Sequence, residues 1–180
     1  TGTWHGYSPC CMGAALEYID AFDPFPREII TIDVQAQDHL WTGTSVARFI
    51  TFILGDAART KVVGEFDMLV LDSDHSYATI SAEIEAFEPL LRPGGTLLFH
   101  DSLYFDGVGA AVGTLRDSGR FELVTLDSPR HTLDFPRTQG RSVFRTPGVT
   151  IARKICAGRP ITPDPAFAGL VLGDVSSPPL

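Results

Sequence analysis

Two apolar segments of the sequence end abruptly in acidic and imidazole side chains. The run LVL leads into DSDHSY within residues 69–77, and TLLF leads into HDS within residues 96–102. Short apolar runs of this kind are typical of buried strands in a parallel sheet, whose carboxyl ends share the edge where ligands bind. Both segments therefore predict strands that carry functional side chains to one edge of an α/β sheet.

Strand and helix patterns alternate along the rest of the chain. Apolar runs predict strands at 28–34, 48–57, 66–74, 96–101, 120–126 and 148–155, and helical periodicity predicts helices at about 9–22, 77–91 and around 108–115. Ser8 should cap the first helix and Pro9 should begin it, while the RPGG turn at 92–95 should end the second. This order predicts a doubly wound, mostly parallel α/β sheet. The last two strands lack a helix between them, so they should form an antiparallel hairpin at its edge.

Length and charge restrict the class of protein. The 180 residues suit one domain over residues 1–156, followed by an extended arm rich in Pro and Gly over residues 157–180. The net charge of −8 without a Lys/Arg cluster argues against nucleic acid or membrane as a partner and favours a small molecule. Formation of a homo-oligomer is a further possibility. We expect a cytoplasmic protein, because no leader or membrane-spanning run is present and the odd number of cysteines, three, supports no disulfide framework.

The chain opens with TGTWHGYS, a glycine-rich segment ahead of the first predicted helix. Its glycines would let the backbone approach a ligand, and the helix would direct free N–H groups at it. The segment alone is a weak signal, because it is not the GxGxxG of dinucleotide folds.

The order of these motifs carries more information than any one of them. The glycine loop, a strand ending in Asp33, a strand ending in GDA, DSDHSY, LRPGG and a strand ending in HD occur in that order. Together they resemble the class I S-adenosylmethionine-dependent methyltransferases. The most similar branch is that of small-molecule O-methyltransferases grouped with cephalosporin-hydroxylase-like and macrolide-sugar methyltransferases. That family has a further strand before the glycine loop, which we expect to be missing here.

The resemblance implies a role for each matching residue. Residues that would bind S-adenosylmethionine are Gly2, Thr3, Gly6 and Ser8 at its methionine and ribose portion, Asp33 at the ribose hydroxyls, Asp56 and Ala57 at the adenine, and Asp72 near the methyl donor. Asp33 and Asp56 have an alternative role as turn-forming residues.

Methyl transfer to a hydroxyl needs a group that removes the hydroxyl proton. His75 suits that role, because imidazole titrates near neutral pH, although it could also cap the following helix. Asp72, His100 and Asp101 could hold Mg²⁺ or another divalent cation, and His100 favours a softer metal or none, because the family's metal-dependent members have an acidic pair there.

The sequence thus predicts transfer of a methyl group from S-adenosylmethionine to a hydroxyl of a small polar molecule, such as a sugar or another secondary metabolite. Two alternatives remain. One is a dinucleotide-dependent oxidoreductase, and the other is a non-catalytic, methyltransferase-like partner subunit.

Overall fold

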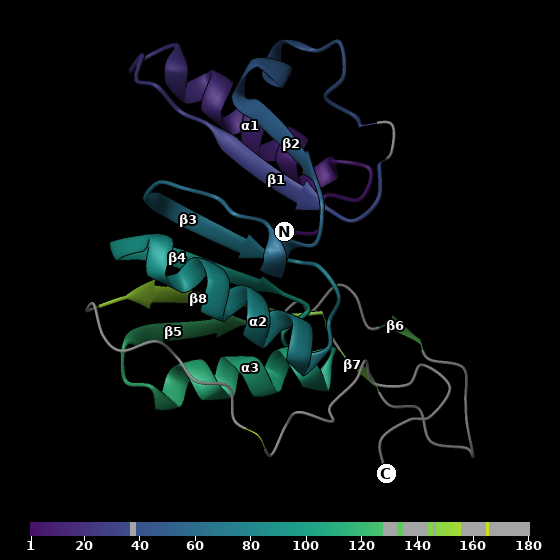
Figure 1. The fold of residues 1–180 in the computed structure, drawn as a ribbon, viewed down its shortest axis with the longest axis vertical. Coiled ribbons are helices and arrows are strands. Elements are labelled where there is room, and N and C mark those ends of the chain that lie inside the picture. Colours follow the sequence, from purple (N-terminus) through teal and green to yellow (C-terminus); the bar gives the residue numbers. More distant parts are fainter. Residues whose placement is uncertain (37–38, 128–132, 135–143, 146, 156–164, 166–180) are drawn as a thin grey trace. The chain divides into compact units, whose positions relative to one another are not determined.

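The computed structural model describes residues 1–36, 39–127, 133–134, 144–145, 147–155 and 165. It divides into two compact units, Thr1–Thr60 and Lys61–Leu180, and each is described by itself (Figure 1). The expected single domain over residues 1–156 stays a prediction. The expected arm over residues 157–180 lies outside the described residues, apart from Pro165.

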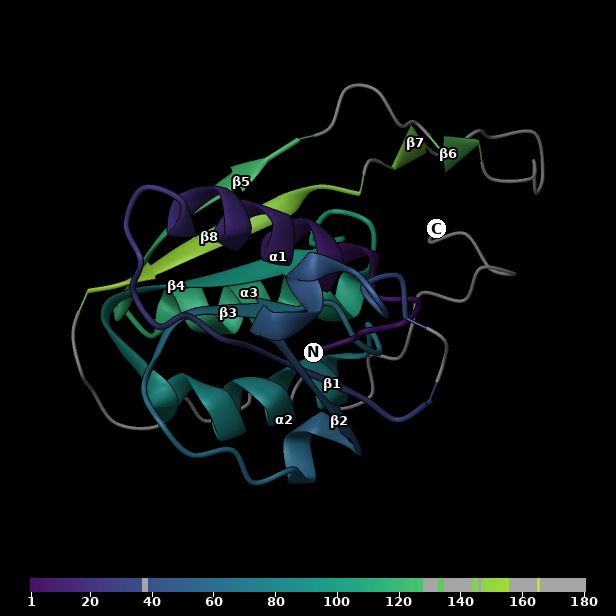
Figure 2. The same ribbon diagram turned by 90° about the horizontal axis from the view of Figure 1, so that it is seen from above.

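The first unit consists of a helix on a two-stranded parallel sheet. Its elements are α1 (Tyr7–Asp20), β1 (Ile29–Asp33), a 3₁₀ helix (Ser45–Phe49), β2 (Ile50–Leu54) and a second 3₁₀ helix (Ala57–Arg59). The strands pair in parallel, with Ile32 opposite Ile53. Helix α1 packs against the first 3₁₀ helix, where Gly13 lies so close to Val46 that a Cβ would be 3.0 Å from it. Figure 2 shows this unit from above.

The sequence placed some boundaries of this unit incorrectly. Helix α1 begins at Tyr7 with Gly6 as its N-cap, so Ser8 and Pro9 lie inside its first turn, and it ends at Asp20. The chain enters the helix through a φ of 84° at Gly6, a left-handed conformation that glycine adopts without steric cost. The strand expected over 48–57 is shorter, since the chain stays in a 3₁₀ helix to Phe49 and turns away after Leu54.

The second unit is a mixed sheet flanked by helices. Its elements are β3 (Phe66–Leu71), α2 (Tyr77–Phe87), a 3₁₀ helix (Glu88–Leu90), β4 (Leu91–His100), α3 (Asp106–Asp117), β5 (Phe121–Leu126), β6 (Leu133–Asp134), β7 (Phe144–Arg145) and β8 (Val149–Lys154). The strand order is β3-β4-β8-β5, and β6 pairs only with β7. Strands β3 and β4 are parallel, whereas β8 runs antiparallel to both of its neighbours.

One face of this sheet packs under α2 and α3, which also pack on each other (Figure 1). Alternate residues of β4 point to that face, so Leu97 and Phe99 are fully buried while Leu98 between them is only partly buried. The core cluster takes Leu71 from β3, Ile80 from α2 and further apolar residues from α3, β5 and β8.

The α/β class and the antiparallel pairing of the last two strands are confirmed. This pair lies at the predicted edge of the sheet, with β5 outermost and β8 between β5 and β4. The helix expected over 77–91 gives way to a 3₁₀ turn after Phe87. Residues 92–95 belong to β4, where the pairing with β3 shifts between Phe66 and Met68, so the glycines form a bulge instead of a turn between elements.

A buried ion network lies at the opposite end of this sheet from the aspartates and histidines. The Lys154 ammonium donates to the carbonyls of Glu88 (2.9 Å) and Leu91 (2.8 Å) and lies 2.8 Å from a Glu88 carboxylate oxygen. Arg120 donates to the same carboxylate oxygen. Because all three charged residues are buried, the loss of one partner would leave another without its counter-charge.

Lys154→Met should therefore lower the free energy of unfolding by about 3–5 kcal/mol, because it leaves two carbonyls and a carboxylate underpaired. Urea unfolding measures the effect. Lys61→Met is the control: Lys61 is exposed, and its loss should cost at most about 0.5 kcal/mol. Equal losses in the two variants would contradict the structural role of the network.

Candidate active site

The register between β3 and β4 places two functional residues next to each other. Leu71 pairs with Phe99, so Asp72 emerges beside His100 at the carboxyl ends of the strands. Their side chains are 3.1 Å apart, measured from Asp72 Oδ1 to His100 Nδ1. The predicted convergence of these strand ends is thus observed for the larger unit.

The segment after Asp72 begins α2 with its own capping residues. Asp74 accepts a hydrogen bond from the Ser76 backbone N–H, and the Ser76 hydroxyl accepts one from the N–H of Thr79. These residues perform the capping that was an alternative role for His75. The imidazole of His75 is thereby left to face the strand ends.

Asp101 begins a tight turn between β4 and α3. Its φ of 56° is unusual for a non-glycine residue, and its carbonyl accepts hydrogen bonds from the N–H groups of Tyr104 and Phe105. The next residue, Ser102, is anchored because its N–H donates to the Gly148 carbonyl. An unusual backbone conformation at a residue whose carboxylate lies close to two histidines is typical of a functional position.

The same turn holds the ring of His75. Phe105 stacks on it, with ring centroids 4.1 Å apart and an interplanar angle of 25°. Gly107 allows this approach, because a Cβ there would lie 2.5 Å from the His75 carbonyl and from the Tyr77 nitrogen. From the sequence, Phe105 could either line an acceptor pocket or simply pack at the sheet edge; in the structure it packs against the His75 ring.

Four side chains meet at this edge: Asp72, His75, His100 and Asp101. Nε2 of His75 lies 3.7 Å from Asp72 Oδ1 and 3.4 Å from Asp101 Oδ2, and Nδ1 of His100 lies 3.3 Å from the same Asp101 oxygen. These two nitrogens, His75 Nε2 and His100 Nδ1, are inaccessible to solvent and lack a hydrogen bond of normal geometry. Buried nitrogens without such bonds, facing two carboxylates, suit a bound cation.

Opposite charges shift the pKa values of this cluster. Burial opposes protonation of His75, but the carboxylates of Asp101 and Asp72 outweigh it and raise its pKa to about 9. Asp101 and then Asp72 raise the pKa of His100 to about 10, against the weaker effect of burial. Burial favours the neutral acids, yet the two histidines lower the pKa of Asp72 and bring that of Asp101 to about 2. Without a cation, both rings therefore carry a proton at neutral pH.

The glycine-rich loop lies in the smaller unit. The Gly2 N–H donates to the Ile32 carbonyl, and the buried hydroxyls of Thr3 and Thr31 share a hydrogen bond of 2.7 Å. Thr3 thus anchors the loop to β1 with its side chain, and its carbonyl accepts a hydrogen bond of 2.7 Å from the Gly6 N–H, which closes the loop. Gly6 has a φ of 84°, and a Cβ there would lie 2.1 Å from the buried ring of Trp41.

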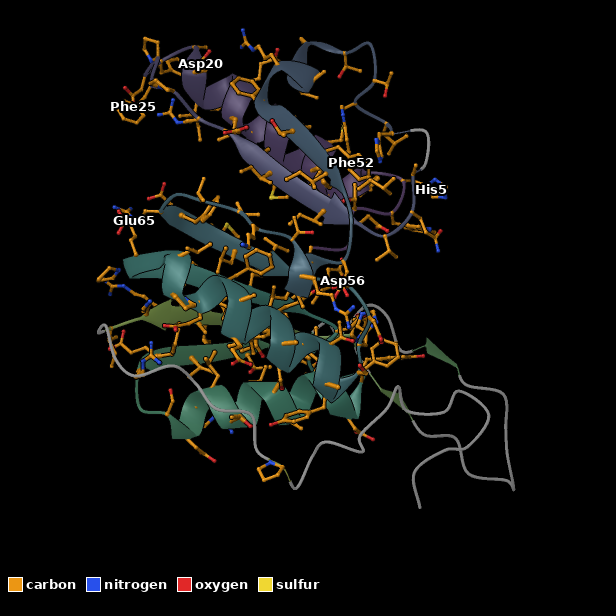
Figure 3. The ribbon with its side chains drawn as sticks, in the orientation of Figure 1. His5, Asp20, Phe25, Phe52, Asp56 and Glu65 are labelled. Atoms are coloured by element: carbon orange, nitrogen blue, oxygen red, sulfur yellow. The ribbon has the colours of Figure 1, made fainter. Side chains whose placement is uncertain are left out.

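The predicted cofactor residues of this unit lie at the same end of its parallel strands. Asp33 accepts hydrogen bonds from the N–H groups of Trp4 (2.8 Å) and Gln35 (2.9 Å), so it braces the loop and keeps lone pairs for a ligand. Asp56 caps the 3₁₀ turn beyond β2 by accepting from the Ala58 N–H (Figure 3). Ala57 is buried, and Ser8 is exposed in the first turn of α1.

The structure therefore brings the predicted site residues together in two groups. Residues of the smaller unit are Gly2, Thr3, Gly6, Ser8, Asp33, Asp56 and Ala57; residues of the larger unit are Asp72, His75, His100 and Asp101. That both groups lie along one shared sheet edge stays a prediction.

Comparison with known proteins identifies the family. Residues 1–102, more than half of the chain, match the family described as a methyltransferase domain, and the chain belongs to it. A search of curated proteins finds no significant match.

Solved structures show the same fold. The O-methyltransferase from Bacillus cereus, in complex with S-adenosylhomocysteine, is 14% identical with a TM-score of 0.59, over 85% of this chain and 71% of that one. The O-methyltransferase TomG from Streptomyces achromogenes, which is involved in tomaymycin synthesis and was solved with S-adenosylmethionine, is 17% identical with a TM-score of 0.59, over 86% and 71%. The methyltransferase PaMTH1 from Podospora anserina, solved with S-adenosylhomocysteine, is 17% identical with a TM-score of 0.57, over 86% and 70%.

Among the described residues, no helix has the length and apolar character needed to cross a bilayer.

Gly6→Ala should destabilise the protein more than Gly43→Ala does. Both glycines have positive φ, so both substitutions carry backbone strain of about 1 kcal/mol. Only at Gly6 does the new methyl group meet a ring, which adds about 1–3 kcal/mol of overpacking. Denaturant unfolding of the two variants gives the difference, and equal losses would contradict the close approach of Trp41.

The stability of the metal-free protein should fall as the pH rises from about 6.5 to 10. A histidine whose pKa is raised from 6.5 to about 9 or 10 stabilises the folded state fully below 6.5 and loses that effect through the higher value. Asp101, whose pKa is lowered from 3.8 to about 2, has its full effect above 3.8 and loses it toward 2.

Urea unfolding in EDTA should therefore show a smaller alkaline loss in the double variant His75→Gln, His100→Gln than in the wild type. His5→Gln, at an exposed histidine outside the cluster, should behave as the wild type. An identical alkaline loss in the wild type and the double variant would argue against the carboxylate–imidazole contacts.

Proposed function

We propose that the chain transfers a methyl group from S-adenosylmethionine to a hydroxyl of a small polar molecule, such as a sugar or another secondary metabolite. The observation that carries this proposal is the convergence of two carboxylates and two imidazoles at the ends of β3 and β4, in a chain of the methyltransferase family. The O-methyltransferases that share the fold support transfer to oxygen. A net charge of −8 suits an acceptor other than nucleic acid or an anionic membrane.

The proposed reaction is an in-line displacement. The acceptor oxygen forms a bond to the methyl carbon while the carbon–sulfur bond breaks, S-adenosylhomocysteine leaves, and the hydroxyl proton must be removed. We expect His75 to remove that proton. With its pKa near 9, however, His75 is protonated at neutral pH in the cation-free cluster and cannot take up another proton.

A divalent cation resolves this conflict. Asp72, His100 and Asp101 offer it two carboxylates and an imidazole, and the two negative charges match its charge. Bound there, a cation would lower the pKa of the neighbouring imidazole and of an acceptor hydroxyl. We therefore include a divalent ion, Mg²⁺ or another, in the proposed function.

The proposed cofactor site lies in the smaller unit. Gly2, Gly6 and Ser8 would approach the cofactor near the start of α1, and Asp33 would accept the ribose hydroxyls. Asp56 and Ala57 would meet the adenine. The role of Asp72, a residue of the larger unit, near the methyl donor stays a prediction. Free thiols at Cys10 and Cys11 suit a cytoplasmic enzyme.

Calorimetric titration with S-adenosylhomocysteine and with NAD tests this proposal. S-adenosylhomocysteine should bind and NAD should not, and Asp33→Asn should weaken binding about 10- to 100-fold, as expected for loss of hydrogen bonds to a charged group. Asp67→Asn, at an exposed aspartate paired with Arg92, is the control and should bind as the wild type.

The transfer itself is tested with radiolabelled methyl on S-adenosylmethionine and a panel of sugars and hydroxylated metabolites. Label should appear as a methyl ether. Binding of NAD instead of S-adenosylhomocysteine would favour the oxidoreductase and overturn the proposal. Cofactor binding without transfer to any acceptor would favour a non-catalytic partner subunit.

A further inference from the structure

We infer that His75 is a fourth metal ligand and that the cluster binds a first-row transition dication such as Co²⁺, Zn²⁺ or Fe²⁺ in preference to Mg²⁺. The inference rests on the proposed function for the use of the site, and it changes the part that His75 plays there. The histidine would act by holding the ion, which would lower the pKa of the acceptor hydroxyl so that its proton passes to solvent instead of to His75. Its basis is the geometry and chemistry of the four donor atoms.

The first argument is the spacing of the donors. The two carboxylate oxygens and two imidazole nitrogens alternate around a quadrilateral with N–O sides of 3.1, 3.3, 3.4 and 3.7 Å. A metal at about 2.0–2.1 Å from tetrahedral donors separates neighbouring donors by roughly 3.3–3.4 Å. Octahedral Mg²⁺ at a similar bond length would hold adjacent oxygens only about 2.9 Å apart. Taken together, the four N–O separations are closer to the tetrahedral value than to the octahedral one.

The second argument is the position of the ring nitrogens. Nε2 of His75 and Nδ1 of His100 each lie within 3.7 Å of both carboxylates. Neither makes a hydrogen bond of normal geometry, and neither is reached by solvent. Two buried nitrogens that lie beside the same two carboxylate oxygens, without such hydrogen bonds to them, are placed as two ligands of a common metal ion would be.

The third argument is the support behind His75. Phe105 stacks on its ring, and Gly107 lets the start of α3 lie against its backbone. Capping by Asp74 and Ser76 leaves the imidazole without a structural duty in α2. A proton-accepting histidine needs room for the acceptor between itself and the ion. Here its Nε2 lies as close to the Asp101 carboxylate as His100 does.

The fourth argument is donor chemistry. Mg²⁺ prefers oxygen donors and retains water, whereas imidazole suits Zn²⁺, Co²⁺ and Fe²⁺. Two imidazoles out of four donors therefore disagree with the Mg²⁺ that the sequence resemblance implied. Two carboxylates neutralise the dication, so the rings can bind as neutral ligands.

Metal titration of the full chain, stripped with EDTA, tests the inference without an acceptor. Co²⁺ serves as the probe, because its visible absorption reports four-coordination, and Mg²⁺ is the comparison. Co²⁺ should bind at least 100-fold more tightly than Mg²⁺. His75→Ala and His100→Ala should each weaken Co²⁺ binding at least tenfold, and His5→Ala should leave it unchanged. His100→Glu, which restores an acidic pair, should shift the preference toward Mg²⁺.

X-ray absorption of the Co²⁺-loaded wild type gives a readout that does not depend on the folding of any variant. Two imidazole ligands are expected. One imidazole, Mg²⁺ binding as tight as Co²⁺ binding, unchanged Co²⁺ affinity in His75→Ala, or no binding of either ion would overturn the inference.

The two proposals fail separately. If S-adenosylhomocysteine does not bind but Co²⁺ binds through two imidazoles, the proposed function fails and the metal site stands. If S-adenosylhomocysteine binds and Co²⁺ shows a single imidazole, His75 is not a ligand and the proposed methyl transfer stands.

Discussion

The hydrogen-bonded register between β3 and β4 determines what the edge of the larger unit can do. Leu71 pairs with Phe99, and this pairing alone places Asp72 beside His100. A slip by one residue would turn one of these side chains to the opposite face. The register is held by packing, because Leu71 and Phe99 are buried under α2 and α3 in the same core. Burial of apolar side chains thus fixes the position of polar ones.

The cluster is held by backbone features on both sides of it. Asp74 and Ser76 begin α2 without involving His75, and the turn at Asp101 tolerates a positive φ, which costs about 1–2 kcal/mol at a non-glycine residue. Two carboxylates at this distance would repel each other if they were alone. Their two imidazole neighbours offset that repulsion, so the arrangement needs either protons or a cation to persist.

Much of this architecture could be predicted from the sequence, because apolar periodicity and turn residues encode it locally. The strands that lead to Asp33, Asp72 and Asp101, and the pairing of the last two strands, follow from such patterns. The N-cap of α1 could not be predicted, because a buried tryptophan far along the chain makes Gly6 the residue that fits. The stacking of Phe105 on His75 and the network around Glu88 likewise depend on contacts between distant segments.

Charge balance connects the geometry of the cluster to its chemistry. Two carboxylates are neutralised either by two imidazolium ions or by one dication with two neutral imidazoles, and either state would hold the same four side chains together. The protonated state is compact but chemically idle, because neither ring can then accept a proton or bind a metal. Binding of a dication must therefore release the ring protons, as metal binding by histidine generally does. The carboxylates that keep both histidines protonated at neutral pH are thus the groups that make the edge a good cation site.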